Sequence, residues 1–385
     1  MRIGILVNDI SLKGGVEVVT VYLAKEFYNN NIPVQIFSIR NTRDTDVNNI
    51  NMNVYNVKNE ITKICQYITN YSITHLIVQL NTPFCIFAEI ELYRKLIFKN
   101  IKIYMVLHNS PLSFLKRYRN VFDECIFIYI LKILKTIVVY NPRVKIFFLE
   151  LKKLNVSFIT LSCGNYYELK KYFGIESYTI YNSVLQKNIV LPKKQDIINK
   201  RNYIVFIGRL DERQKGLVFL LDSWKKINRK NWRLLIIGDG PDEENLRKYA
   251  HNNKIQDTYF LGWQNRDNVN KILSLSKIFV MTSTHEGFPT VFYEALVNDT
   301  VIICTKFDGF SDELIKNNLN ALVCKRNRKE FINGLHKLID DPILLKSFMD
   351  NNAIVLSEYN KLNVVEQWLN TFSYTKVDKE YKNNY

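Results

Sequence analysis

The segment Glu286–Glu294, with the sequence EGFPTVFYE, constrains the fold of this chain more than any other. It follows the apolar run Ile278–Met281, which is typical of a strand buried on both faces of a parallel sheet. A helical pattern begins at Pro289, and proline suits the first turn of a helix because its missing N–H is not needed there. Glu286 is therefore expected in a loop at the carboxyl end of a strand, where open α/β sheets bind ligands. Carboxylates at this position suit a ligand with many hydroxyl groups, such as a ribose or a hexose.

Strand and helix patterns alternate along the 385 residues, which predicts an α/β protein with parallel sheets. The length favours two domains, because a single core rarely grows this large. The predicted strands are 3–7, 33–38, 73–79, 102–107, 136–140 and 178–181, with weaker candidates at 52–57 and 158–161, then 203–207, 233–237, 259–261, 278–281, 301–304 and 321–323. The predicted helices of the second half are 216–228, 241–252, 268–275, 290–297, 328–339, 342–357 and 362–372.

A polar, Lys-rich stretch at 186–201 interrupts this alternation, and we interpret it as a linker. It would separate an N-terminal Rossmann-like domain (1–185) from a C-terminal Rossmann-like domain (202–360). Residues 361–375 predict a C-terminal helix, and 376–385 form a polar tail. Two similar domains imply a cleft between them, which is a preferred place for a small molecule.

The formal net charge of +16 indicates an anionic partner. Nucleic acid, anionic lipid headgroups and phosphorylated small molecules all fit, and charge alone does not choose among them. The six cysteines have neither metal-ligand nor redox-motif spacing, which favours a reducing cytosol. A strand rather than a signal peptide follows Met1, and the most apolar stretch, 125–140, is short and carries two lysines. We therefore expect a cytoplasmic protein.

Two further loops have the composition of anion sites. Gly14 and Gly15 end a loop before a helix, where backbone N–H groups accept an anion. Arg209 and Lys215 follow the strand 203–207, and both side chains suit the oxygens of one diphosphate. Fixed cations of this kind hold a diphosphate and stabilise it as it leaves.

One histidine is a candidate for contact with the substrate, and no metal site is expected. His108 follows the strand 102–107 and could donate to or accept from a substrate hydroxyl near neutral pH. Asp44 and Asp46 could hold a divalent cation, but they lie in a long polar loop with no strand leading into it. The other histidines lack metal-ligand spacing.

Four motifs, in this order and spacing, resemble the family 4 (group 1) retaining glycosyltransferases, which have the two-domain GT-B fold: Gly14–Glu17, Gly208–Gly216, Ile236–Pro241 and Glu286–Glu294. The resemblance covers essentially the whole chain and is strongest in residues 203–325. It implies a metal-independent hexosyltransferase that moves a hexose or N-acetylhexosamine from a nucleotide diphosphate sugar, which we expect to be UDP-linked. The nucleotide sugar is a co-substrate, and no cofactor is expected.

The resemblance also implies a role for each matching residue. Arg209 and Lys215 would hold the donor diphosphate, Glu286 would contact the transferred sugar, and Glu294 would bind the ribose hydroxyls. His108 would line the catalytic centre together with Glu286, Arg209 and Lys215. The other residues implied on the donor side are Gly14, Gly15, Gly238, Gly240, Trp263, Gly287, Phe288, Pro289 and Thr290. The helix 362–372 would return to the first domain.

In the family, the first domain holds the acceptor, often a sugar on a polyprenyl diphosphate or another lipid. Lys116, Arg117 and Arg119 lie among aromatic residues, and such a segment suits an anionic membrane surface. The sequence therefore predicts a peripheral enzyme on the inner face of the cell membrane, acting in the synthesis of a surface polysaccharide, lipopolysaccharide, capsule or glycolipid.

Three alternatives stay open: a nucleotide-sugar epimerase on the same fold, a basic nucleic-acid-binding protein, and a non-catalytic subunit. The dispersed basic residues and the lack of a recognition module disfavour nucleic acid. The chain departs from the family pattern at Val297–Thr300 and Asp308–Glu313, both near the donor side, which leaves the identity of the donor open.

Overall fold

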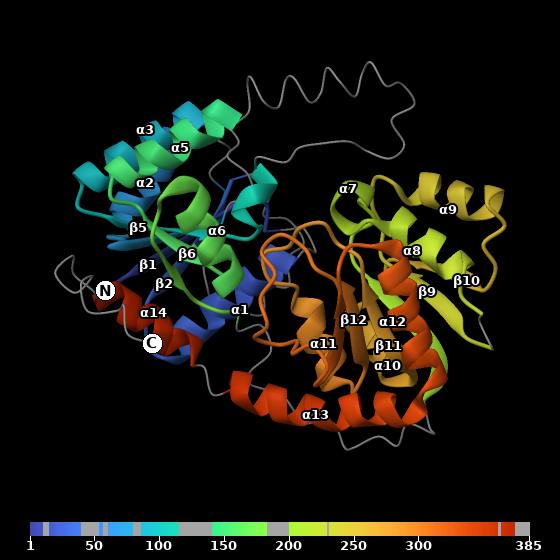
Figure 1. The fold of residues 1–385 in the computed structure, drawn as a ribbon. Helices are drawn as coiled ribbons and strands as arrows, with labels where there is room; N and C mark the ends of the chain where they lie inside the picture. The colour runs from blue at the N-terminus through green and yellow to red at the C-terminus, as the bar shows by residue number, and fades with distance from the viewer. Residues whose placement is uncertain are drawn as a thin grey trace, which may run out of the picture. The chain divides into compact units, whose positions relative to one another are not determined.

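A computed structural model describes residues 1–10, 15–39, 54–56, 61–79, 86–114, 141–182, 200–228, 231–360 and 363–373 (Figure 1). The chain divides into two units. The first comprises Met1–Pro111, Asn141–Val184 and Leu362–Tyr385, and the second comprises Leu112–Tyr140 and Leu185–Lys361. The sequence assigns 112–140 to the first domain, whereas this division places it with the second unit; beyond Phe114 that segment, including the predicted strand 136–140, lies outside the described residues.

The first unit is built on a seven-stranded parallel sheet with the order β3-β2-β1-β4-β5-β6-β7. The strands are β1 (Ile3–Val7), β2 (Val34–Ser38), β3 (Val54–Asn56), β4 (His75–Gln79), β5 (Lys102–Leu107), β6 (Ser157–Thr160) and β7 (Ser177–Thr179). The helices are α1 (Gly15–Asn29), α2 (Ile61–Asn70), α3 (Ile86–Phe98), α5 (Asn141–Lys153), α6 (Cys163–Phe173) and α14 (Val364–Ser373). A 3₁₀ turn at Pro111–Phe114 begins at the last residue of the stretch Met1–Pro111 and continues into the part assigned to the second unit. In this unit α2, α3 and α5 pack side by side on one face of the sheet, and α1 and α14 pack together on the other (Figure 1). The apolar run of β1 is buried along its whole length because both faces are covered.

The second unit is built on a six-stranded parallel sheet with the order β10-β9-β8-β11-β12-β13. The strands are β8 (Arg201–Ile207), β9 (Arg233–Ile237), β10 (Thr258–Gly262), β11 (Ser276–Met281), β12 (Val301–Thr305) and β13 (Ala321–Cys324). The helices are α7 (Glu212–Lys215), α8 (Leu217–Lys225), α9 (Glu243–Asn252), α10 (Arg266–Leu275), α11 (Thr290–Val297), α12 (Arg328–Asp340) and α13 (Pro342–Asn360). Both sheets reverse their direction of strand addition once, which is the doubly wound arrangement.

The core of the second unit forms where α8 packs between its neighbours α9 and α12, and α12 also packs on β12 and β13. Trp224 of α8 is fully buried, and its indole N–H donates to the carbonyl oxygen of Gln256 at 3.2 Å. Phe219 of α8 meets Phe331 of α12 edge to face, with ring centroids 5.5 Å apart. The sequence predicts one helix over 216–228, whereas α8 ends at Lys225 and the separate short helix α7 precedes it.

The end of the predicted linker belongs to the second unit. β8 begins at Arg201, and Lys200 is buried beside it. The Lys200 ammonium donates to the carbonyl oxygens of Ser274, Ser276 and Asn298 at 2.9, 3.1 and 2.8 Å. The sequence predicts a solvated linker residue at this position, whereas Lys200 is buried and hydrogen-bonds to backbone carbonyl oxygens of the second unit. The rest of the predicted linker, 186–199, lies outside the described residues.

The last described helix, α14, packs on the first unit. Trp368 meets Phe27 of α1 and Tyr104 of β5 edge to face, with centroid separations of 6.5 and 6.2 Å. The ring centroid of Phe372 lies 4.9 Å from that of Tyr104 and 4.8 Å from that of His75. Burial, together with the nearby charge of Lys102, lowers the pKa of His75 to about 4, so its ring is a neutral part of this aromatic cluster. None of the helices formed by the described residues is both long and apolar enough to cross a membrane.

Replacing Trp368 with alanine tests the contribution of α14 to the first unit. Because the side chain is almost fully buried, we expect Trp368→Ala to lower the free energy of unfolding by about 3 kcal/mol or more. Urea denaturation followed by near-UV circular dichroism measures this loss. Asn370→Ala, at an exposed position of the same helix, is the control and should unfold like the wild type. Equal stability of the two variants would contradict the packing role.

Candidate functional site

Two loops of the second unit lie side by side because their strands are neighbours. β8 and β11 pair in parallel, although β9 and β10 intervene in the chain, and this is the switch point of the sheet. The loop after β8 carries Arg209 and Lys215, and the loop after β11 carries Glu286. Ligands of open α/β sheets bind at the carboxyl ends of strands at such a point.

Hydrogen bonds join these two loops. The backbone N–H of Thr284 donates to the carbonyl oxygen of Gln214 at 2.7 Å, and its hydroxyl donates to that of Arg213 at 2.9 Å. The Thr282 hydroxyl lies 3.1 Å from the carbonyl oxygen of Lys215 and 3.0 Å from that of Gly216. The backbone that carries Lys215 is therefore fixed against the loop that carries Glu286.

The two loops are also joined by an ion pair between predicted site residues. The Lys215 ammonium lies 2.6 Å from Oε1 of Glu286, and the two side chains are only 15% and 8% exposed. The Gln214 side-chain amide donates to the other oxygen of Glu286, Oε2, at 3.3 Å. Both carboxylate oxygens of Glu286 thus have a donor from the β8 loop.

Arg209 and Glu294 are near this ion pair in the sequence, but neither side chain is part of it. Arg209 is exposed, and its side chain forms no hydrogen bond or ion pair with any residue that the structure describes. Glu294 lies on α11, which begins directly after the Glu286 loop, and burial raises the pKa of its carboxyl while the charge of Arg266 opposes that rise. Within the described part of the chain, no group donates a hydrogen bond to this carboxylate. It is a half-buried acceptor that a ligand hydroxyl would satisfy.

The turn after β9 approaches the β8 loop so closely that it requires glycine. Gly238 has a φ of 132°, and a Cβ atom there would collide with the carbonyl oxygen of Gly208. A Cβ atom on Gly240 would collide with the backbone of Leu210. Trp263, beyond the end of β10, is about half exposed. The structure thus brings Gly238 and Gly240 against the loop that carries Arg209.

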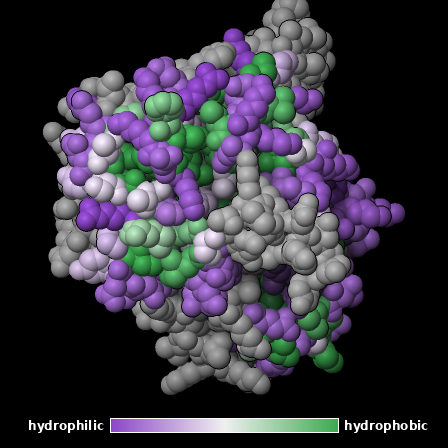
Figure 2. Space-filling view, turned by 90° about the vertical axis from the view of Figure 1, so that its left-hand side faces the viewer, coloured by the Kyte–Doolittle hydropathy of each residue, from purple (hydrophilic) through white to green (hydrophobic). Residues whose placement is uncertain are grey.

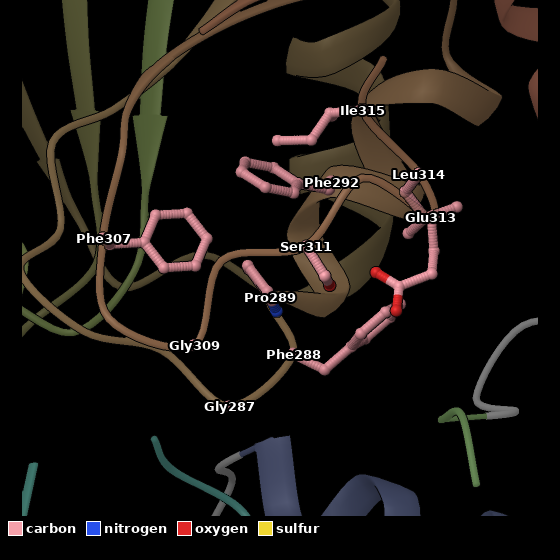
Figure 3. Close-up of a pocket in the computed structure, with 10 residues that line it drawn as sticks. All are labelled: Gly287, Phe288, Pro289, Phe292, Phe307, Gly309, Ser311, Glu313, Leu314 and Ile315. Carbon is pink, nitrogen blue, oxygen red and sulfur yellow. The ribbon is translucent and has the colours of Figure 1, made fainter. Parts of the chain in front are cut away.

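The residues after Glu286 line a small pocket that the sequence does not predict. Gly287, Phe288 and Pro289 form one side of it, and Thr290 begins α11. Figure 3 shows the rings of Phe292 and Phe307 next to each other, with centroids 6.3 Å apart, and the Glu313 carboxylate beside Phe288. The Phe288 ring stacks on Tyr359 of α13 with centroids 5.9 Å apart, which anchors the loop. Part of the lining comes from Asp308–Glu313, where the chain departs from the family pattern, and only the folded chain brings that segment to the Glu286 loop.

His108 and Gly15 lie in the first unit, at the carboxyl edge of its sheet. The Nε2 atom of His108 is buried and has no hydrogen-bond partner in the described chain, and burial lowers the pKa of the ring to about 4. The imidazole is therefore neutral at pH 7. Gly15 is the exposed first residue of α1.

Several predicted residues lie outside the described residues: Gly14, Asp44, Asp46, Lys116, Arg117 and Arg119. Among the residues that the structure does describe, no group of three or more His, Cys, Asp or Glu side chains could hold a metal ion.

A buried carboxyl beneath the site was missed at the sequence level. Glu212 lies in α7, and its carboxylate accepts the backbone N–H of Val218 at 2.8 Å, at the start of α8. Its own N–H donates to Asp242 at 2.8 Å. Burial raises the pKa of Glu212 to about 7, against the opposing charge of Arg326. An acid before the first turn of a helix is the signal that could have found it. Glu212 holds the Lys215 loop onto α8.

The raised pKa of Glu212 predicts a pH-dependent stability. A carboxyl whose pKa is higher in the folded state stabilises most below its unfolded pKa, near 4.5, and this contribution is lost as pH rises through about 7. Glu212→Gln keeps an acceptor but cannot ionise. We expect its Tm to match the wild type at pH 5 and to exceed it by a few degrees at pH 8. Differential scanning calorimetry over this range measures the difference. Glu244→Gln, on the surface of α9, should follow the wild type, and parallel profiles for Glu212→Gln would contradict the assignment.

Comparison with known sequences finds a family match in the second unit. Residues 188–354 match the family model of glycosyl transferases group 1. An N-acetylgalactosamine-N,N'-diacetylbacillosaminyl-diphospho-undecaprenol 4-alpha-N-acetylgalactosaminyltransferase from Campylobacter jejuni is 25% identical over 213 residues, 54% of this chain and 57% of that protein. The lipopolysaccharide 1,6-galactosyltransferase of Escherichia coli is 31% identical over 125 residues, 30% of this chain and 33% of that protein. The chain spans about half the length, or less, of the curated relatives that it matches.

Solved structures match along nearly the whole chain. S. aureus TarM in complex with UDP has a TM-score of 0.74 at 14% identity and covers 97% of this chain and 100% of its own. Anabaena HepE in complex with UDP has a TM-score of 0.74 at 16% identity, with the same coverage. At these identities the likeness concerns the fold alone, and it confirms the predicted pair of Rossmann-like domains. The chain therefore has the GT-B fold, and its residues 188–354 are similar to group 1 glycosyl transferases.

Proposed function

We propose that this protein is a retaining hexosyltransferase. It moves a hexose or N-acetylhexosamine from a nucleotide diphosphate sugar, which we expect to be UDP-linked, to a glycan or lipid-linked saccharide. The observation that carries the proposal is the ion pair of Lys215 and Glu286 beside the exposed Arg209, within the segment that matches group 1 glycosyl transferases. The UDP complexes of TarM and HepE, which share the fold, support the choice of nucleotide.

The cations of the β8 loop, Arg209 and Lys215, would bind the leaving diphosphate. In the reaction, the bond between the anomeric carbon and the diphosphate oxygen breaks, and the acceptor oxygen bonds to that carbon on the same face. The acceptor proton passes to the departing diphosphate. Arg209 and Lys215 would stabilise the negative charge that grows there, and a hydrogen bond from Thr282 holds the backbone that carries Lys215. No step needs a metal ion or another cofactor.

The carboxylates of Glu294 and Glu286 would bind the ribose and the transferred sugar of the donor. Glu294 lacks a hydrogen-bond donor among the described residues, so the two hydroxyls of a ribose would satisfy a half-buried group. Glu286 would accept hydrogen bonds from the transferred sugar. His108 is neutral, so it would act as a hydrogen-bonding group rather than as a charged acid.

The names of the relatives support an acceptor in polysaccharide, lipopolysaccharide or lipid-linked glycan synthesis. A location at an anionic membrane is supported by the outer face of α5. There Arg143, Lys145 and Lys153 are exposed, with Ile146 and Leu149 half exposed among them. Figure 2 views the molecule from the side on which α5 lies in Figure 1, and hydrophobic residues are interspersed there with hydrophilic ones. Cations combined with apolar side chains suit the interface of an anionic bilayer.

The site assignment predicts large losses of activity. Because each variant removes a preorganised charge contact, we expect Lys215→Ala and Glu294→Ala to lower the rate of transfer by about 100-fold. The rate is measured as acceptor-dependent release of nucleoside diphosphate, which also separates transfer from epimerisation. Lys248→Ala, at an exposed lysine of α9, is the control and should keep wild-type turnover. Near-normal turnover by both site variants would reject the assignment.

The membrane location predicts salt-sensitive binding to vesicles. We expect the protein to float with liposomes that contain anionic lipid at low salt and to be released at high salt, because screening weakens exposed charges. The double variant Arg143→Glu/Lys145→Glu should float less, and vesicles of neutral lipid are the control. Failure of the wild-type protein to bind anionic vesicles at low salt would end this part of the proposal.

A further inference from the structure

We propose that the Lys215–Glu286 ion pair makes the site discriminate between an intact nucleotide sugar and the spent nucleoside diphosphate. The carboxylate of Glu286 offsets the charge of the Lys215 ammonium, which would contact the diphosphate. When a ligand draws this ammonium away, only a ligand that carries a sugar offers hydroxyl groups that hydrogen-bond to Glu286 in its place. This inference rests on the proposed function and adds to it a role for Glu286 in releasing the product.

The geometry pairs two groups that the proposed reaction needs separately. The Lys215 ammonium would bind the diphosphate and the Glu286 carboxylate would bind the sugar, yet the two groups lie 2.6 Å apart in this structure. Both side chains are largely shielded from solvent, so water screens the carboxylate charge poorly. Gln214 donates to the second oxygen of Glu286 at 3.3 Å and holds it in place.

This arrangement has opposite consequences for the two ligands. A spent nucleotide meets a lysine whose charge is offset by an adjacent anion, so the attraction of its diphosphate to this part of the loop is weak. Such a ligand also brings no hydroxyl donor to Glu286. An intact nucleotide sugar brings sugar hydroxyls, and their charge-assisted hydrogen bonds to Glu286 replace part of what the carboxylate loses when Lys215 turns to the phosphates. Arg209 is not paired in this way, so it attracts both ligands alike.

The inference predicts that removing the charge of a substrate-binding residue tightens the binding of product. Glu286→Gln keeps the shape of the side chain and an oxygen that accepts from Lys215 but removes the negative charge. We expect this variant to bind UDP about tenfold more tightly than the wild type at low salt. The gain should shrink at high salt, because it is electrostatic. UDP-glucose and UDP-N-acetylglucosamine should gain less than UDP, since they lose their hydrogen bonds to the carboxylate.

Isothermal titration calorimetry with UDP, with GDP and ADP as further probes, measures these affinities. The matched control is Glu244→Gln, which removes the same charge from an exposed pair with Lys248, also 2.6 Å long, and should leave the affinity for UDP unchanged. In a Lys215→Ala background, Glu286→Gln should give a much smaller gain, because the cation that it unmasks is gone. Thermal unfolding of every variant verifies that the second unit is folded.

Two results separate this inference from the function on which it rests. Folded Glu286→Gln protein that binds UDP no more tightly than wild type would overturn the inference and leave the transferase intact. An equal gain in the Lys215→Ala background would overturn it as well, since the effect would not act through the pair. Wild-type protein that binds none of the nucleotides and transfers no sugar would reject the proposed function together with the inference.

Discussion

The site depends on the attachment of the loop after β8 to the loop after β11. The strands are adjacent at the switch point of the sheet, so the loops start side by side, and hydrogen bonds from Thr282 and Thr284 keep them together. Lys215 and Glu286 can form a short ion pair only because their backbones are fixed in this way. Without that attachment, the cation and the acid would be two solvated side chains on independent loops, and such a pair is worth little.

The fold could be predicted largely from local patterns. Buried parallel strands are continuous apolar runs, and Ile3–Val7, Lys102–Leu107 and Arg233–Ile237 have the predicted bounds because the pattern and the burial coincide. The predicted boundary between linker and second domain is wrong where a polar residue is buried in the structure. The Lys200 ammonium donates to carbonyl oxygens inside the second unit rather than to solvent.

The candidate site could be predicted only in part. Glu286 and Lys215 lie 71 residues apart in the chain, and their pairing follows from strand order, which no local pattern contains. The carboxyl of Glu212 and the ring of His108 have pKa values set by burial, and burial comes from distant segments. A sequence can thus name the groups that do chemistry, while their charge states need the folded chain.

The position of α14 determines the order in which the protein can be completed during synthesis. Phe27, His75 and Tyr104 form the platform that this helix covers, and they are made long before it. The ribosome must finish the whole second unit before Trp368 and Phe372 emerge to cover the platform. The aromatic surface of the first unit therefore stays uncovered while the second unit is synthesised. Domains usually fold in the order in which they are synthesised, but the first unit lacks its last helix until the second is finished. Nascent chains arrested before residue 363 would expose a surface that suits a chaperone.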